Sequence, residues 1–423
     1  MTLSVVIPYF RQVRALDLSL GALAAQDPDA GRFEVVIVDD DSRDEVESLV
    51  ETYRDRLDLR LVRLPVNLGR AAARNRGVAE ATGERIVLLD ADSLADPGLV
   101  GRHARFHIDH PEKVLLGARI EHDWRAVHDP TRPPPPSAYH TDLRYRWGLD
   151  PETFSDSPAP WIFGYSHHMS VPTAQIRALG GFDERFVRWG HEDVEFSYRL
   201  FLAAGRQPGH FHFDPLALCH HVPHFRNALS NWAEADGILP YMIDKHRTME
   251  VELYKEGPLG VNAALPTYLE RLGSLHDRDN RAALDEILAA LPHRQEPGRL
   301  GIGIGLADRM ASHPGTELVD HRPPAEAPPG LIGLRLPYPG DRFADLLNLD
   351  VWRIASPEHL SKMVIESLRV ARAVYLGGSK GLPTDDLGLV DCPDHLCDML
   401  RGHTDSEVIH DGDHAWVIRI RRR

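Results

Sequence analysis

Apolar runs of strand length alternate with helically spaced stretches along the N-terminal part of the chain. Each run ends at a proline or at acidic residues, as in "LSVVIPYF", "FEVVIVDDDS", "LRLVRLP" and "RIVLLDADS". Between them, apolar residues at 14–26, at 46–50 and from Asn67 to Gly83 have the spacing of helices. Strands that alternate with helices predict an α/β fold with a mostly parallel, Rossmann-like sheet.

The pattern changes along the chain and predicts three parts. Residues 1–227 form the α/β domain, whose halves are 1–120 and 121–227, and residues 228–297 form a helical segment. After a linker at "RQEPGR", the strand-like runs "LGIGIGL", "LIGLRLPY", "ARAVYLGG" and "AWVIRIR" predict a separate α/β domain at 298–423, to which the sequence assigns no role. "LGIGIGL" carries G-x-G-x-G, which we interpret as a packed, glycine-rich strand.

Composition and charge narrow the classes of function. A chain of 423 residues exceeds one ordinary core, and a net charge of −15 argues against a broad nucleic-acid surface. Three cysteines do not make a disulfide framework and fit a reducing compartment. The N-terminus "MTLSVVIPYF" has no basic leader, and we find no apolar run of about 18 residues. We therefore expect a cytoplasmic protein, either free or peripherally attached, without a membrane span.

Acidic residues follow two of the predicted strands. The pattern D-x-D starts at 27, 39, 90, 277 and 411, but only those at 39 and 90 come directly after apolar strands. Ligands in parallel α/β sheets bind beyond the carboxyl ends of the strands. Carboxylates there can hold a divalent cation such as Mn²⁺ or Mg²⁺, and the cation can hold a diphosphate. The alternative is that these acids are solvated and cap the next helix.

Five ordered motifs give the chain its resemblance to a known family. They are "VVIPYF", "EVVIVDDDS", "NLGRAAARNRGVAEATGERIVLLDADS", "GGFDERFVRWGHEDVEFSYRL" and "LCHHVPH". With them, residues 2–225 resemble the family 2 glycosyltransferases, which have the GT-A fold. The resemblance implies a nucleotide-sugar donor, in this case a UDP-sugar, a divalent metal and transfer to a hydroxyl acceptor with inversion. The acceptor can be a glycan, a peptide or a small molecule.

The resemblance also implies which residues bind the donor. Asp40 would pair with the base, and Pro8 and Tyr9 would line the nucleoside pocket. Asp90 would face the ribose and Asp92 the metal. The segment that crosses the donor contributes three further residues: Gly69, Arg70 and Arg74.

The stretch "RWGHED" matches the family motif that carries the catalytic base. The resemblance places the base on Asp193, while Glu192 orients the acceptor or caps the helix. A positioned carboxylate is needed because a hydroxyl is a poor nucleophile until its proton is removed. Trp189 offers a flat face to an acceptor, and Gly190 permits close backbone approach. His168 lies in the acceptor region, where the family often has other residues.

A histidine after the run "PLALC" completes the metal site of many relatives. We assign this role to His220, with His221 as the competitor, because adjacent residues on a strand point to opposite faces. A zinc site is an alternative use of the histidines in this region, which are His210, His212, His220, His221 and His224.

Two other classes of function stay open on the sequence alone. A nucleotidyltransferase also uses acids and metal on an α/β sheet, but it needs a phosphate-binding loop where this chain has "PYFRQ". A catalytically inactive sugar-nucleotide-binding or scaffold module would not need Asp92, Asp193 and His220 together. Neither the sugar, the acceptor nor the oligomeric state follows from the sequence.

Overall fold

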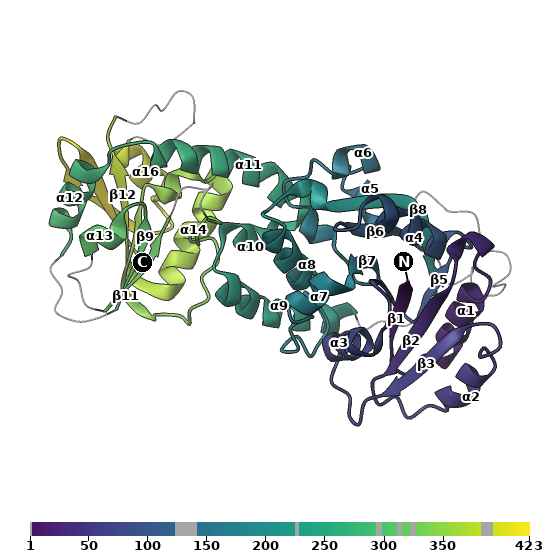
Figure 1. Cartoon of the computed structure of the whole chain (residues 1–423). Coiled ribbons are helices and arrows are strands. Elements are labelled where there is room, and N and C mark those ends of the chain that lie inside the picture. The colour runs from purple at the N-terminus through teal and green to yellow at the C-terminus, as the bar shows by residue number, and fades with distance from the viewer. Residues whose placement is uncertain are drawn as a thin grey trace. The chain divides into compact units, whose positions relative to one another are not determined.

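The computed structural model divides the chain into two compact units, residues 1–238 and 239–423. It describes residues 2–122, 142–224, 228–292, 298–310, 315–321, 327–381 and 392–423. Figure 1 labels the elements of both units along the chain. The linker predicted near residue 294 lies outside the described residues.

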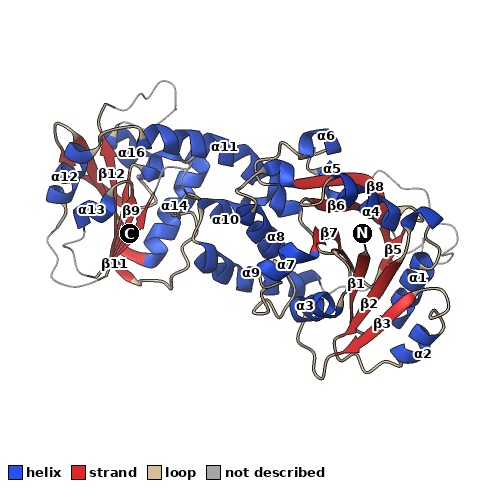
Figure 2. Ribbon diagram, viewed as in Figure 1, coloured by secondary structure: helices blue, strands red, loops and turns tan. Residues whose placement is uncertain are grey.

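The first unit is built on a mixed sheet of eight strands, with helices on both of its faces (Figure 2). Its strands are β1 Leu3–Tyr9, β2 Phe33–Asp39, β3 Asp58–Arg63, β4 Arg85–Leu89, β5 Ser93–Ala95, β6 Val114–Glu121, β7 His168–Pro172 and β8 Phe211–His221. Its longer helices are α1 Val13–Leu23, α2 Val46–Glu51, α3 Arg70–Glu80, α4 Leu99–Asp109, α7 Thr173–Ala178, α8 Glu192–Ala203 and α9 Ala228–His246, which runs past the unit boundary. Short helices are α5 Leu143–Arg146, α6 Pro151–Phe154, η1 Pro28–Ala30, η3 Pro160–Phe163 and η4 Pro208–His210.

The strand order of this sheet creates a crevice at its carboxyl edge. The order is β3-β2-β1-β4-β7-β6-β8-β5, and the first four of these strands are parallel. From β1 the chain builds outward to β3 and then returns to place β4 on the other side of β1. At such a reversal the connections diverge, which leaves a crevice beyond the strand ends. Tyr9, Asp40 and Asp90 stand at or just after those ends, so the predicted α/β sheet is confirmed and these three residues share one edge of it.

One predicted boundary differs from the structure for a clear physical reason. The helix expected to begin at Asn67 begins at Arg70. Residues before it are held out of the helix, because Gly69 has φ +90° and its backbone N–H donates to Asp40. A side chain at Gly69 would lie 2.4 Å from the carbonyl oxygen of Val187. Glycine is therefore required at this turn.

The second unit contains a six-stranded sheet in the order β10-β9-β11-β12-β14-β13. Its strands are β9 Arg299–Gly303, β10 Thr316–Asp320, β11 Phe343–Leu349, β12 Ala371–Ser379, β13 Asp405–Asp411 and β14 Ala415–Arg421. Its helices are α10 Met249–Leu253, η5 Tyr254–Glu256, α11 Gly257–His276, α12 Arg281–Ala290, α13 Leu306–Met310, η6 Val351–Ile354, α14 Pro357–Val370 and α16 Pro393–Leu400.

The helices between the two sheets are not a segment of their own. Leu284 and Ile287 of α12 share a buried cluster with Tyr375 and Val417 of the second sheet. Burial of that apolar face draws α12 into the C-terminal unit, whereas we expected a separate part at 228–297. The unit boundary lies within α9, after residue 238.

The glycine-rich run of β9 is a packed strand, as predicted. A side chain at Gly301 would lie 2.9 Å from Leu318, and one at Gly303 would lie 2.8 Å from Leu306. Both glycines therefore make room for apolar neighbours.

Two observations bear on the expected environment of the protein. Among the described residues, no helix is both long enough and apolar enough to cross a lipid bilayer. Cys219, Cys392 and Cys397 are free thiols.

Candidate functional site

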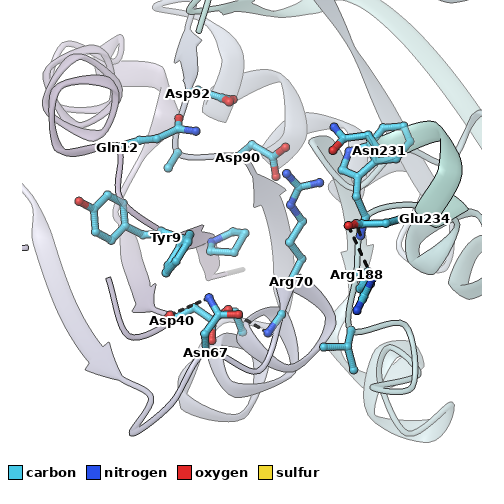
Figure 3. A pocket seen from close by; sticks show the side chains of 17 residues that line it. Tyr9, Gln12, Asp40, Asn67, Arg70, Asp90, Asp92, Arg188, Asn231 and Glu234 are labelled. Atoms are coloured by element: carbon cyan, nitrogen blue, oxygen red, sulfur yellow. Dashed lines mark hydrogen bonds and ion pairs between the residues drawn. The ribbon is translucent and has the colours of Figure 1, made fainter. Parts of the chain in front are cut away.

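A cavity of about 400 Å³ opens at the carboxyl edge of the first sheet. Figure 3 shows Tyr9, Gln12 and Asp40 on one side of it, with Asn231 and Glu234 across from them. Seven predicted donor residues line it together with Trp189: Pro8, Tyr9, Asp40, Gly69, Arg70, Asp90 and Asp92. Residues that we did not predict also line it: Phe10, Gln12, Asn67, Ala73, Ala91, Val187, Arg188, Asn231 and Glu234.

Asp40 organises the loop that covers one wall of this cavity. Its Oδ1 accepts a hydrogen bond from the N–H of Leu68 at 2.7 Å, and its Oδ2 accepts from Gly69 at 2.9 Å. The Asn67 amide donates to the backbone carbonyl of Asp40 at 3.1 Å. Burial raises the pKa of Asp40. Each carboxylate oxygen keeps a second lone pair, so Asp40 can still accept a hydrogen bond from a ligand.

Tyr9 is fixed as a neutral, buried ring beside Pro8. Its hydroxyl donates to Oδ2 of Asp44 at 2.6 Å, and burial raises the pKa of Tyr9 well above its usual value. A ring held in this way gives the cavity a flat apolar wall, on which a nucleobase can stack.

Arg74 joins the two acidic motifs of the sequence. Its Nη2 lies 3.0 Å from Oδ1 of Asp90, and its Nη1 lies 3.0 Å from Oε1 of Glu192. Arg74 and Glu192 are buried, and neither is part of the cavity lining. The structure therefore corrects two expectations. Arg74, expected to bind the donor, does not line this cavity, and Glu192, expected to orient the acceptor or cap α8, makes no cap and is instead the ion-pair partner of Arg74.

Asp193 is half-buried at the start of α8. Its Oδ1 accepts a hydrogen bond from the N–H of Val194 at 2.8 Å, and its Oδ2 accepts from Ser166 at 3.3 Å. Burial raises the pKa of Asp193 to about 7, the negative charge of Glu192 adds to the shift, and Arg74 opposes it. A carboxylate with such a pKa is suited to exchange protons near neutral pH.

Asp92 forms a compact group with His221, the last residue of β8, and His224, which follows the strand. Its Oδ2 lies 3.4 Å from Nε2 of His221 and 3.4 Å from Nδ1 of His224. The three ligand atoms lie within 4.8 Å of one another. The other oxygen of Asp92 is buried and has no hydrogen-bond partner among the described residues. One carboxylate and two imidazoles suit a divalent cation such as Mn²⁺, and the unpartnered oxygen gives that cation a further ligand.

Glu121 fixes the orientation of the His221 ring through the ring nitrogen that does not face Asp92. The Nδ1 of His221 lies 2.8 Å from Oε2 of Glu121, which leaves Nε2 directed at Asp92. A carboxylate on the far nitrogen fixes the ring and makes it a stronger ligand, as is common in metal sites. Glu121 had no signal in the sequence, because it comes from β6, the strand beside β8.

His220, our assigned metal ligand, points elsewhere. Its Nε2 lies 3.1 Å from Oδ1 of Asp96, and its Nδ1 lies 2.8 Å from His122. In the pairing of β5 with β8, Ser93 lies opposite His221 and Leu94 lies opposite His220. Successive residues face opposite sides of a strand, so only one of the two can reach Asp92. The assignment to His220 is therefore wrong in geometry.

The five-histidine zinc site is not formed either. His212 stacks on His110 and contacts Lys113, and His210 packs edge-on against Phe211. Within the described residues, His221 and His224 are the histidines that gather with Asp92.

His168, our acceptor candidate, is a core residue of β7. Its Nε2 lies 2.9 Å from Nε2 of His103, and its Nδ1 lies 3.1 Å from the carbonyl oxygen of Ala118. A side chain at Gly117 would lie 2.1 Å from its ring, so the neighbouring strand packs directly on it. His168 is fully buried because β7 lies between β4 and β6.

We expect the first unit to lose stability at acid pH, because it contains three buried histidines, His103, His107 and His168. Burial lowers the pKa of His107 and of His168 to about 4, and lowers that of His103 well below its usual value. Between about pH 6.5 and pH 4 the unfolded chain therefore binds more protons than the folded one, and stability falls as pH falls. We expect up to about 1.4 kcal/mol per pH unit for each histidine.

Calorimetric unfolding between pH 7.5 and pH 4.5 measures this slope. His107→Gln should flatten the pH dependence of the melting temperature, although it lowers the melting temperature itself. His403→Gln is the control, because His403 is exposed. An equal slope in wild type and in His107→Gln would contradict the prediction.

The segment with Trp189 and Gly190 packs on α9. Trp189 lines the cavity and meets Trp232 edge to face, with ring centroids 5.9 Å apart. Gly190 has φ +112°, and a side chain there would lie 2.8 Å from Cβ of Ala235. The close approach that we expected to a substrate is thus an approach to α9.

Parts of the chain are similar to known glycosyltransferases. Residues 4–169 match the model of glycosyl transferase family 2, and residues 155–214 match the N-terminal domain of galactosyltransferase. The validoxylamine A glucosyltransferase of Streptomyces hygroscopicus subsp. jinggangensis is 32% identical over 274 residues, which are 60% of this chain and 63% of that protein. The chondroitin synthase of Pasteurella multocida is 28% identical over 47% of this chain and 23% of its own length. The crystal structure of S. aureus TarS 1–349 with UDP-GlcNAc aligns with a TM-score of 0.42 and 21% identity, covering 58% of this chain and 66% of that chain.

Residues 4–169 are thus similar to glycosyl transferase family 2, the family that the sequence motifs indicated, and the first unit has the predicted α/β fold. The chain spans less than two thirds of the length of the curated relatives just named, at 63% and 23%.

Proposed function

We propose that the chain is a metal-dependent glycosyltransferase that moves a sugar from a nucleoside diphosphate donor to a hydroxyl acceptor with inversion. The proposal rests on one observation: Asp40 and Asp92, which come from two different sequence motifs, line the same cavity. Asp92 brings the cation site with His221 and His224 to the same cavity. A nucleoside at one end and a cation at the other match the two ends of a nucleoside diphosphate.

The donor would bind by stacking and hydrogen bonding. Its base lies against Pro8 and Tyr9, and its polar edge faces Asp40 and Asn67. Asp90, held by Arg74, faces the ribose. Arg70 lines the cavity near Asp90 and supplies positive charge to the diphosphate (Figure 3). When bound by Asp92, His221 and His224, Mn²⁺ or Mg²⁺ supplies charge that stabilises the departing diphosphate.

Asp193 would act as the general base. The acceptor hydroxyl oxygen forms the new bond to the anomeric carbon while the bond from that carbon to the diphosphate oxygen breaks. The hydroxyl proton moves to a carboxylate oxygen of Asp193, and the nucleoside diphosphate leaves with the bonding electrons. Attack opposite the leaving group inverts the configuration. The hydrogen bonds from Val194 and Ser166 keep the carboxylate in one orientation during this transfer.

A UDP-sugar is the proposed donor, and glucose is the first sugar to test. Asp40 can accept a hydrogen bond from the imide N–H of uracil. The relative at 32% identity is a glucosyltransferase whose named acceptor is validoxylamine A. Validoxylamine A is therefore the first acceptor to test with this chain. The free cysteines support a reducing, cytoplasmic location.

Donor competition tests the proposal. We expect UDP to bind more tightly than GDP or ADP, because Asp40 can accept a hydrogen bond from the imide N–H of uracil. Calorimetric titration of each nucleotide with Mn²⁺ measures this order. Incubation with UDP-glucose and validoxylamine A should release UDP. Tighter binding of GDP than of UDP would overturn the base assignment, and failure of every nucleotide to bind would overturn the function.

A further inference from the structure

The cavity wall opposite the nucleoside side comes from α9. Asn231 and Glu234 line it, and Figure 3 shows both across the cavity from Tyr9 and Asp40. Helix α9 begins at residue 228, whereas the family matches end at residue 214. The matches to the two family models therefore do not include this wall.

Helix α9 is fixed against the segment that carries the proposed base. The N–H of Trp189 donates to Oε2 of Glu234 at 3.3 Å, and Nη1 of Arg188 lies 4.0 Å from Oε1 of the same residue. The tight contact of Gly190 with Ala235 adds an apolar point of attachment. Any ligand seated on this face of α9 is held at a constant position relative to the start of α8.

A second cavity, of about 540 Å³, adjoins the first. The two share Val187, Arg188 and Glu234 in their linings, so they meet along one edge of α9. The second cavity is otherwise lined by Arg185, Phe186, Ser230, Ala233, Gly237 and Ile238. No residue of the Asp40 loop lines the second cavity, so this cavity adds space beyond the proposed donor residues.

The chemistry of this surface matches a neutral polyhydroxylated ligand. Trp189 is half-buried, and its neighbour Trp232 is 65% exposed, so the pair offers an aromatic surface that water still reaches. Indole faces pack on the C–H faces of sugar rings, while the Asn231 amide and the Glu234 carboxylate can hydrogen-bond to hydroxyl groups. Together the two cavity linings hold four acidic residues and three arginines, which leaves little net attraction for an anion.

We propose that α9 forms the acceptor subsite, and that this subsite takes a neutral acceptor of at least two sugar-like rings. The proposal rests on the proposed function and extends it to the acceptor. The reacting hydroxyl lies at the edge of the first cavity, between the donor and Asp193, and the rest of the acceptor lies along Trp189 and Ala233 into the second cavity, with Trp232 packed edge to face on Trp189.

Two variants of α9 test the subsite from opposite directions. Trp232→Ala removes the exposed aromatic surface, and Ala233→Trp fills the second cavity. Leu229→Ala is the matched control, because Leu229 is 85% exposed on the same helix, does not line the second cavity as Ala233 does, and has no ring to pack on Trp189 as Trp232 does. Calorimetry measures UDP affinity, and saturation-transfer NMR measures binding of maltose and cellobiose to the full chain loaded with UDP and Mn²⁺.

We expect a neutral disaccharide to bind the loaded wild type and the Leu229→Ala control equally. Each of the other two variants should weaken this binding about tenfold or more, while UDP affinity stays within about twofold. Loss of UDP binding in wild type would count against the proposed function itself. The acceptor proposal is overturned if neither disaccharide binds the loaded wild type, if both variants bind as wild type does, or if glucose 6-phosphate binds in preference to the disaccharides.

Discussion

Asp193→Asn is expected to lower sugar transfer by about 10²-fold or more while leaving donor affinity nearly unchanged. The amide keeps the shape of the carboxylate and its hydrogen bonds from Val194 and Ser166, but it cannot take a proton. Asp193 is absent from the lining of the cavity in which the donor is proposed to bind. The measurement is turnover of UDP-glucose at saturating acceptor, beside UDP affinity by calorimetry.

The pH dependence of wild type gives the same prediction an independent signature. Burial and the charge of Glu192 raise the pKa of Asp193 to about 7, and a base works only when it is ionised. Turnover should therefore rise as pH increases through about 7 and level off above it. Glu192→Gln removes a negative neighbour, so it should lower the pKa of Asp193 and move this limb to lower pH.

The Glu192 variant also distinguishes the two acids. Glu192 is buried and paired with Arg74, which the variant leaves with a neutral amide, so Glu192→Gln should cost stability as well as shift the pH profile. It should keep substantial turnover. Near wild-type turnover in Asp193→Asn, together with an inactive but folded Glu192→Gln, would move the base to Glu192.

The parts of the site that the sequence predicted are those held by local chain geometry. Residues at or directly after β1, β2 and β4 must meet at one edge because these strands are parallel and adjacent. Once the strands are recognised from their apolar runs, Tyr9, Asp40 and Asp90 follow. The turn at Gly69 could not be predicted from its own segment. Its conformation depends on hydrogen bonds that the N–H groups of Leu68 and Gly69 donate to Asp40, which lies in an earlier part of the chain.

The parts that were missed depend on contacts between distant segments. The ion pair of Arg74 with Glu192 joins residues 118 positions apart, and the sequence around neither residue indicates that they pair. The side of the sheet that His220 faces could not be inferred by counting alternate residues along β8, because the pairing of β8 with β6 shifts register after Gly117. Asn231 and Glu234 lie on α9, whose helical pattern is ordinary and carries no motif.

His221→Ala is expected to reduce Mn²⁺-dependent UDP binding by at least about tenfold, whereas His220→Ala should leave it within about twofold. The two residues are neighbours on β8, so the pair of variants isolates the direction of the side chain from every other property of the strand. His221 lies 3.4 Å from Asp92, and His220 instead contacts Asp96 and His122. Loss of a group that only supports a metal ligand already costs about 10–100-fold, so loss of a ligand should cost at least as much.

Titration of UDP by calorimetry, with Mn²⁺ and then with chelator, measures the metal-dependent part of the affinity. Direct titration of Mn²⁺, followed by electron paramagnetic resonance, gives a second readout that does not require turnover. Asp92→Asn should match His221→Ala in both experiments, because it removes the negative charge that the cation needs. Glu121→Gln should give an intermediate loss, since Glu121 contacts the far nitrogen of His221 and would not touch the metal. If His220→Ala loses metal-dependent binding and His221→Ala retains it, the strand is turned the other way and the metal site would be built on Asp96.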